Sequence, residues 1–236
     1  MTVDYDSFTR ASTFIHWLQG GALLLLGAAE AYALKRPGRR AGLIGPLALL
    51  LAGAAGLAVI LALQGDWSFT GLAGALALRR GFHLFIAFSC LFVAAGLSGL
   101  MHYLTGAGSR RWQIPFLVFL AAIAALYFLL AWRVNDDALR AVLRAHAAIG
   151  GALLLAVLAY AFYAASGRRA LHTCWVLLLL AAGAQLLAYR ENAAAFGPRI
   201  VTVEAGAPPA AQPVKAAAPT AVTLNAALAD KKRSGN

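Results

Sequence analysis

Residues 143–165 read LRAHAAIGGALLLAVLAYAFYAA, an apolar run whose one charged side chain, Arg144, lies at its start. Crossing about 30 Å of hydrocarbon takes about 20 helical residues, so this run is long enough to span a membrane. An open strand cannot cross lipid because its backbone groups would stay unpaired. The run also lacks the polar–apolar alternation of a barrel strand. It therefore predicts a transmembrane α-helix.

Five further runs of similar length predict an all-α, polytopic membrane bundle. The six expected spans are 14–34, 41–63, 82–104, 114–132, 143–165 and 170–189. The connections are short except 64–81, which contains Gly65, Asp66 and Trp67 and which we expect to form an amphipathic surface segment. All five tryptophans fall near span ends, as is typical of a membrane–water interface.

The composition supports the same class. The chain is 61% hydrophobic and 12% charged, whereas soluble domains have about 45–50% apolar and about 25% charged residues. The net charge of +11 comes from basic clusters at the ends of the apolar runs. Such clusters are typical of topology signals and lipid headgroup contacts. The charge therefore indicates a membrane and does not indicate nucleic acid.

The composition changes after the last run, which divides the chain into a membrane domain, 1–190, and a tail, 191–236. The tail is rich in Ala and Pro and has few large apolar side chains. It cannot bury enough surface to offset chain entropy, so we expect an extended segment. Ile200 to Val203 could add a strand to a partner's sheet.

Basic residues in short loops predict the orientation. The three loops on one side hold eight of them and the opposite side holds six: Lys35, Arg36, Arg39, Arg40, Arg110, Arg111, Arg168 and Arg169 against Arg10, Arg79, Arg80, Arg133, Arg140 and Arg144. The first side is expected to be cytoplasmic. Both termini are then expected outside the cytoplasm, which in a bacterial inner membrane is the periplasmic side.

All five histidines lie inside or at the ends of apolar runs, where ionisable residues are costly and are functional candidates. By span order, His102 and His172 lie near the inner face, and His83, His146 and His16 near the outer face. The interpretation is two bis-histidine metal sites, His102 with His172 and His83 with either His146 or His16. The helices that carry them would form a haem-binding four-helix core. The alternative is that each histidine hydrogen-bonds a neighbouring helix.

Small and basic residues accompany these histidines. Gly20, Gly99 and Gly150 lie three or four residues from a histidine on the same helix face, where missing side chains would admit a porphyrin. Arg144 near the outer set and Arg111 near the inner set could pair with haem propionates. The competing interpretations are close helix packing for the glycines and topology anchoring for the arginines.

Two motifs carry a family resemblance. The segment from Arg10 to His16-Trp17, running into an apolar helix, and the stretch from His146 to Gly150 resemble the "R…HW" and "HxxxG" helix starts of the bacterial cytochrome b561 and hydrogenase/formate dehydrogenase cytochrome b superfamily. This resemblance implies a membrane bundle that holds b-type haems through histidine pairs and exchanges electrons with quinone. Here the chain has six spans, whereas the family usually has four.

The functional expectation is a dihaem b-type cytochrome that moves electrons between the quinone pool and a partner redox subunit or protein. His16, the fifth histidine, either hydrogen-bonds a quinone or replaces His83 or His146 as an iron ligand. One alternative is a self-contained quinone-linked superoxide or ferric reductase. Another is a non-redox membrane scaffold or transporter subunit, although the spans hold essentially one carboxylate, Glu30.

Overall fold

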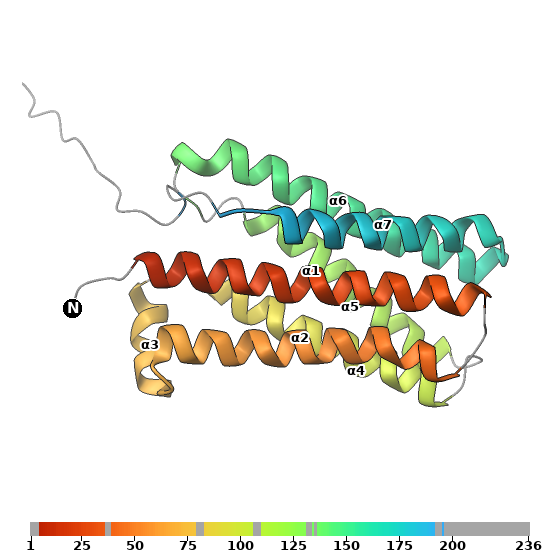
Figure 1. Cartoon of the computed structure of the whole chain (residues 1–236), viewed down its shortest axis with the longest axis horizontal. Coiled ribbons are helices and arrows are strands. Elements are labelled where there is room, and N and C mark those ends of the chain that lie inside the picture. The colour runs from red at the N-terminus through yellow and green to blue at the C-terminus, as the bar shows by residue number, and fades with distance from the viewer. Residues whose placement is uncertain are drawn as a thin grey trace, which may run out of the picture. The chain divides into compact units, whose positions relative to one another are not determined.

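The structure is a computed structural model of the chain and describes residues 5–35, 39–78, 83–105, 110–130, 134, 136–191 and 195. The described part is helical (Figure 1): α1 Tyr5–Lys35, α2 Arg39–Gly65, α3 Phe69–Leu78, α4 His83–Thr105, α5 Arg110–Leu130, α6 Asp136–Ser166 and α7 Arg169–Ala188. Nearly all of the predicted tail, including the Ile200 to Val203 segment, lies outside the described residues.

Five of the described helices are long and apolar enough to cross a membrane: α2, α4, α5, α6 and α7. Large apolar side chains on their outer surfaces are exposed, among them Leu51, Val118 and Leu177. A soluble protein rarely leaves so much apolar surface open, whereas a lipid-facing helix requires it. The described helices are therefore those of a multi-pass membrane protein.

The first predicted span, 14–34, falls within α1, which is as long as α6 but is not among the five. Its apolar stretch contains His16, Gln19 and Glu30, which lower its mean hydropathy. All three side chains are buried inside the helical unit. The residues that weaken α1 as a membrane segment are thus the ones it contributes to the interior.

The six long helices follow a closed order of neighbours. Helix α1 packs against α2 and α7, α2 against α4, α4 against α5, α5 against α6, and α6 against α7. We call this arrangement the ring. Successive long helices run in opposite directions along it (Figure 1). The start of α1, the start of α6 and the end of α7 therefore share one end of the ring.

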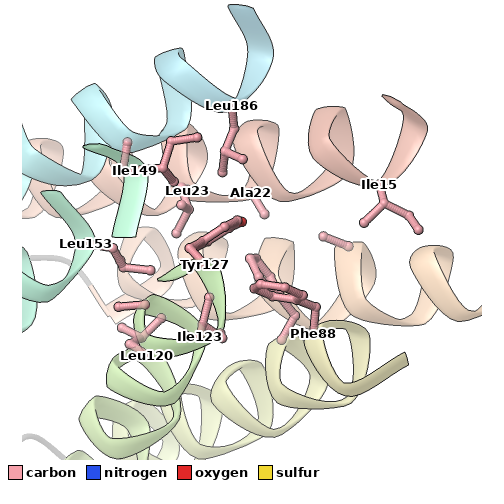
Figure 2. Packing of buried hydrophobic residues seen from close by; sticks show 14 of the residues in the cluster. Ile15, Ala22, Leu23, Phe88, Leu120, Ile123, Tyr127, Ile149, Leu153 and Leu186 are labelled. Carbon is pink, nitrogen blue, oxygen red and sulfur yellow. The ribbon is translucent and has the colours of Figure 1, made fainter. Parts of the chain in front are cut away.

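Large side chains fill the middle of the ring. Figure 2 shows Tyr127 of α5 reaching toward Ala22 and Leu23 of α1, with Phe88 of α4 nearby. The Tyr127 hydroxyl donates a hydrogen bond of 2.7 Å to Gln19 Oε1 on α1, and the Tyr127 ring lies 4.7 Å from that of Phe88. Because α1 and α5 are not neighbours in the ring, this contact crosses its interior.

Two boundaries differ from the sequence-based expectation. Helix α1 begins at Tyr5 and α6 at Asp136, each several residues before the apolar run starts. Apolar length predicts where a helix enters lipid, but backbone hydrogen bonds let the helix continue into the polar zone. The 64–81 connection contains the short α3, which packs on α2 after a turn at Asp66 and Trp67.

Candidate functional site

Two histidines from different helices meet at the ring end that holds the start of α1. His16 Nε2 of α1 and His146 Nε2 of α6 are 3.4 Å apart, and both residues are almost completely buried. Their ring centroids are 5.5 Å apart. The centroid distance exceeds the nitrogen distance by nearly two ring radii, so the imidazoles point at each other tip to tip.

The helices that carry these histidines also fix their tautomers. His16 Nδ1 lies 2.7 Å from the Ser12 carbonyl oxygen, and His146 Nδ1 lies 2.9 Å from that of Val142. A carbonyl oxygen only accepts, so each Nδ1 must carry the hydrogen and donate. When both rings are neutral, each Nε2 presents a lone pair. Two lone pairs then face each other in a buried site.

Such an arrangement suits a metal held between the rings. Histidine ligands commonly donate the other ring N–H to a carbonyl or carboxylate, which orients the ring and raises its basicity. With metal–nitrogen bonds of about 2 Å on either side, the two nitrogens would stand about 4 Å apart. The observed 3.4 Å requires only a small separation of α1 and α6.

The segment after α7 covers this histidine pair. The Tyr189 ring centroid lies 4.8 Å from the centroids of both His16 and His146. Tyr189 donates to Glu191 Oε1 at 2.9 Å, and Ser12 Oγ donates to Glu191 Oε2 at 2.5 Å. Because the Tyr189 centroid is equally distant from the two histidine centroids, it lies on the plane midway between the two imidazole rings.

The side chains of His83, Arg144 and Arg111 are exposed, unlike those of the histidine pair. The His83 side chain, at the start of α4, is exposed. Arg144 is exposed and its Nε donates to the Arg140 carbonyl oxygen at 3.3 Å, and Arg111 is exposed near the start of α5. The sequence interpretation paired His83 with either His146 or His16 and gave His16 as a possible replacement for His83 or His146. In the structure His16 and His146 face each other, and His83 is exposed.

The three glycines lie where helices pack closely. A Cβ added to Gly20 would lie 2.8 Å from the Gly183 carbonyl oxygen, and one added to Gly150 would lie 2.8 Å from that of Ala124. At Gly99 the nearest atoms, 3.0 Å away, belong to Pro46. Neighbouring helices already use the room that these glycines leave. Close packing accounts for all three, and they give no support to a porphyrin.

A second polar cluster lies at the opposite end of the ring. His172 Nε2 of α7 is 2.9 Å from Glu30 Oε2 of α1, and the Tyr103 hydroxyl of α4 donates to Glu30 Oε1 at 2.5 Å. His172 and Glu30 are both buried. His102 is buried on α4 beside Tyr103, their ring centroids 5.5 Å apart. The ring order places α4, which carries His102, opposite α7, which carries His172.

Sequence reasoning missed most of the partners in both clusters. Ser12 lies one helical turn before His16, and Tyr103 follows His102 directly, so spacing alone carried a signal for these two. Glu30 was noted only as an isolated carboxylate. Tyr189 and Glu191 were placed in a span end and a tail, and nothing in their local sequence indicates that they contact histidines.

Two ligands suit a haem better than a bare ion. Among the described residues, no group of three or more His, Cys, Asp or Glu side chains could hold a metal ion. A haem supplies four nitrogens of its own and takes its axial ligands from the protein. His16 and His146 could supply the two side-chain nitrogens that this ligation requires.

No family model, no curated protein and no solved structure matches the chain.

Proposed function

We propose that the chain is a b-type membrane cytochrome that passes electrons between the quinone pool and a partner redox protein, with His16 and His146 as axial ligands of a haem. The observation that carries this proposal is the buried pair of facing Nε2 atoms, 3.4 Å apart, each on a ring whose Nδ1 is bonded to a backbone carbonyl. Helix α1, which supplies His16, is then the sixth membrane span. The haem supplies reversible one-electron transfer.

The donor set fits this cofactor, and the Tyr189 ring lies between the two histidines. The Tyr189 ring centroid is 4.8 Å from the centroids of both imidazoles, so Tyr189 would have to move for a haem to be held between them. Tyr189 follows the last residue of α7, and its hydroxyl bonds Glu191 just beyond it.

A second haem between His102 and His172 has weaker support. His172 Nε2 is already bonded to Glu30 Oε2 at 2.9 Å. We retain the two-haem protein as the fuller form of the proposal. Its inner-membrane location, its quinone and its partner subunit belong to the proposal as well.

Haem content of matched histidine variants tests the assignment. The full chain, expressed with haem supplementation and purified in detergent, should give a b-type reduced-minus-oxidised spectrum. His16→Ala and His146→Ala should each remove one haem per chain in a pyridine haemochrome assay, because one axial ligand is lost. His83→Ala is the matched control, since this exposed histidine at the same end should leave the content unchanged.

Two outcomes would contradict the proposal. One is wild-type protein without haem. The other is a loss of haem in His83→Ala with full content in His16→Ala. Tyr189→Ala provides an independent check, because removing the ring from the plane between the histidines should leave haem content unchanged or raise it.

A further inference from the structure

Helix α3 leaves the direction of the long helices as soon as α2 ends. Figure 1 shows it lying crosswise to them at one end of the ring. Its 10 residues make a helix about 15 Å long, half of the roughly 30 Å of hydrocarbon that a span must cross. In a protein whose neighbouring helices span the membrane, a short crosswise helix lies along the membrane surface.

One face of α3 is fixed to the rest of the helical unit. A Cβ added to Gly71 would lie 2.6 Å from the Gly65 carbonyl oxygen, so glycine is required for this close approach to the end of α2. Leu72 and Leu76, four positions apart on one helix face, pack against the buried core. The other face, which begins at Phe69, is left exposed.

The turn that directs α3 across the ring end is strained. Asp66 and Trp67 have φ values of 46° and 57°, in the left-handed region that bulky side chains rarely adopt. The Trp67 and Phe69 side chains are 69% and 80% exposed, so packing within the described part of the chain does little to offset this strain. Aromatic side chains are stabilised at a membrane–water interface, which would supply the missing contacts.

The polar groups of α3 suit the boundary between lipid headgroups and acyl chains. The helix sequence, FTGLAGALAL, contains no charged side chain. The hydroxyl groups of Ser68 and Thr70 are hydrogen-bonded to each other at 2.7 Å, and Ser68 Oγ accepts from the Gly71 N–H at 3.4 Å. Partners within the chain lower the cost of removing these groups from water. The exposed apolar surface also continues from α2, whose exposed Leu63 lies four positions before Trp67.

We propose that α3 is an interfacial helix whose exposed face inserts between phospholipid headgroups and acyl chains, with Trp67 and Phe69 as its anchors. Its apolar residues therefore serve two contacts. Leu72 and Leu76 hold it to the helical unit, and the opposite face contacts lipid. This insertion is independent of the haem proposed at His16 and His146.

Spin labels in the full chain test the insertion, after reconstitution into vesicles of phosphatidylethanolamine and phosphatidylglycerol. Single cysteines at Phe69 and Ala73 carry a nitroxide, in a background where Cys90 and Cys174 are replaced by alanine. Power-saturation EPR compares collisions with oxygen, which concentrates in lipid, and with a water-soluble nickel chelate. The ratio of oxygen to nickel collisions should be several-fold higher at both positions than at Ser166→Cys, an exposed position beside the α6–α7 connection.

A lipid-facing control completes the comparison. Leu177→Cys replaces an exposed leucine in the middle of α7 and should also give a high ratio of oxygen to nickel collisions. The proposal is overturned if the labels at Phe69 and Ala73 match Ser166→Cys, because α3 would then lie in water. It is also overturned if both labels collide weakly with both reagents, because a second copy of the chain or another protein would then cover the helix.

Trp67→Phe gives a second readout that needs no label. The fluorescence of the wild type minus that of Trp67→Phe isolates the Trp67 emission from that of the other tryptophans. Phospholipids brominated on their acyl chains should quench this difference more strongly than iodide in the water phase does. Stronger quenching by iodide would place Trp67 in water and contradict its role as an anchor.

Discussion

At the scale of single residues, one hydrogen bond joins two helices that are not neighbours. Tyr127 of α5 donates to Gln19 of α1 across the ring, and both side chains are buried. Hydrocarbon offers no replacement partner, so the bond stabilises the contact between these helices. The same pair lies between the histidine cluster and the apolar core, with the Tyr127 ring 6.0 Å from that of His146.

Tyr127→Phe should therefore destabilise the protein while leaving its packing nearly unchanged. Interhelical hydrogen bonds in membrane proteins contribute about 0.6–1.7 kcal/mol, so we expect a loss of roughly 1 kcal/mol. Unfolding by SDS titration in mixed micelles measures this difference. Tyr32→Phe is the control, because its side chain is 52% exposed and should give no change. Equal stability of the two variants would show that the bond across the ring contributes nothing.

The choice among the outer histidines shows where sequence reasoning ends at this scale. Depth could be predicted, because position within an apolar run gives height in the membrane. His16, His83 and His146 all lie at the outer end by that measure. Which two face each other depends on how each helix is rotated about its axis. That rotation is set by packing between helices, and the structure buries His16 and His146 and leaves His83 exposed.

At the scale of elements, two pairs of adjacent glycines show that sequence spacing alone does not predict which glycine packs against a neighbouring helix. Both His16 and His146 are followed, four and five residues later, by two glycines. Only the first glycine of each pair, Gly20 or Gly150, meets a neighbouring helix. At Gly21 and Gly151 an added Cβ would find nothing within 4 Å. The same spacing of two glycines after a histidine therefore gives one contact residue and one open position on each helix.

Alanine at each of the four positions should reveal this difference. Gly20→Ala and Gly150→Ala place a methyl group against backbone carbonyl oxygens, and such overpacking typically costs about 1–3 kcal/mol. Gly21→Ala and Gly151→Ala should be neutral or stabilising by up to about 1 kcal/mol, because alanine favours helix. SDS titration again provides the measurement. A loss at Gly21 equal to that at Gly20 would contradict the close packing of α1 against α7.

The six long helices themselves were predictable, since each apolar run of about 20 residues has one stable form in lipid. Their order around the ring was not predictable in this way. Short connections favour packing of consecutive helices, but they do not indicate that α7 closes the ring against α1. That closure depends on the approach of Gly20 to Gly183, which depends on the rotation of both helices about their axes.

At the scale of the whole helical unit, the two clusters lie at opposite ends. Glu30 follows His16 by 14 residues on the same helix, which separates their Cα atoms by about 21 Å along α1. In a membrane-spanning unit this distance places one cluster near each face. The haem site proposed at His16 and the contact between Glu30 and His172 would then lie near different sides of the membrane.

The topology prediction tests this arrangement as a whole. If α1 is a sixth span, the start of α1 and the end of α7 lie on one side, and the basic loops predict that this side is outside the cytoplasm. Single cysteines at Arg10 and Arg190 should react with a membrane-impermeant maleimide on intact cells, in a background where Cys90 and Cys174 are replaced by alanine. Cysteines at Leu34 and Ser166 should react only in inverted vesicles. Labelling of Arg10→Cys together with Ser166→Cys would show that α1 does not cross. Reversal of all four positions would preserve the six-span bundle but show that the basic loops face outward.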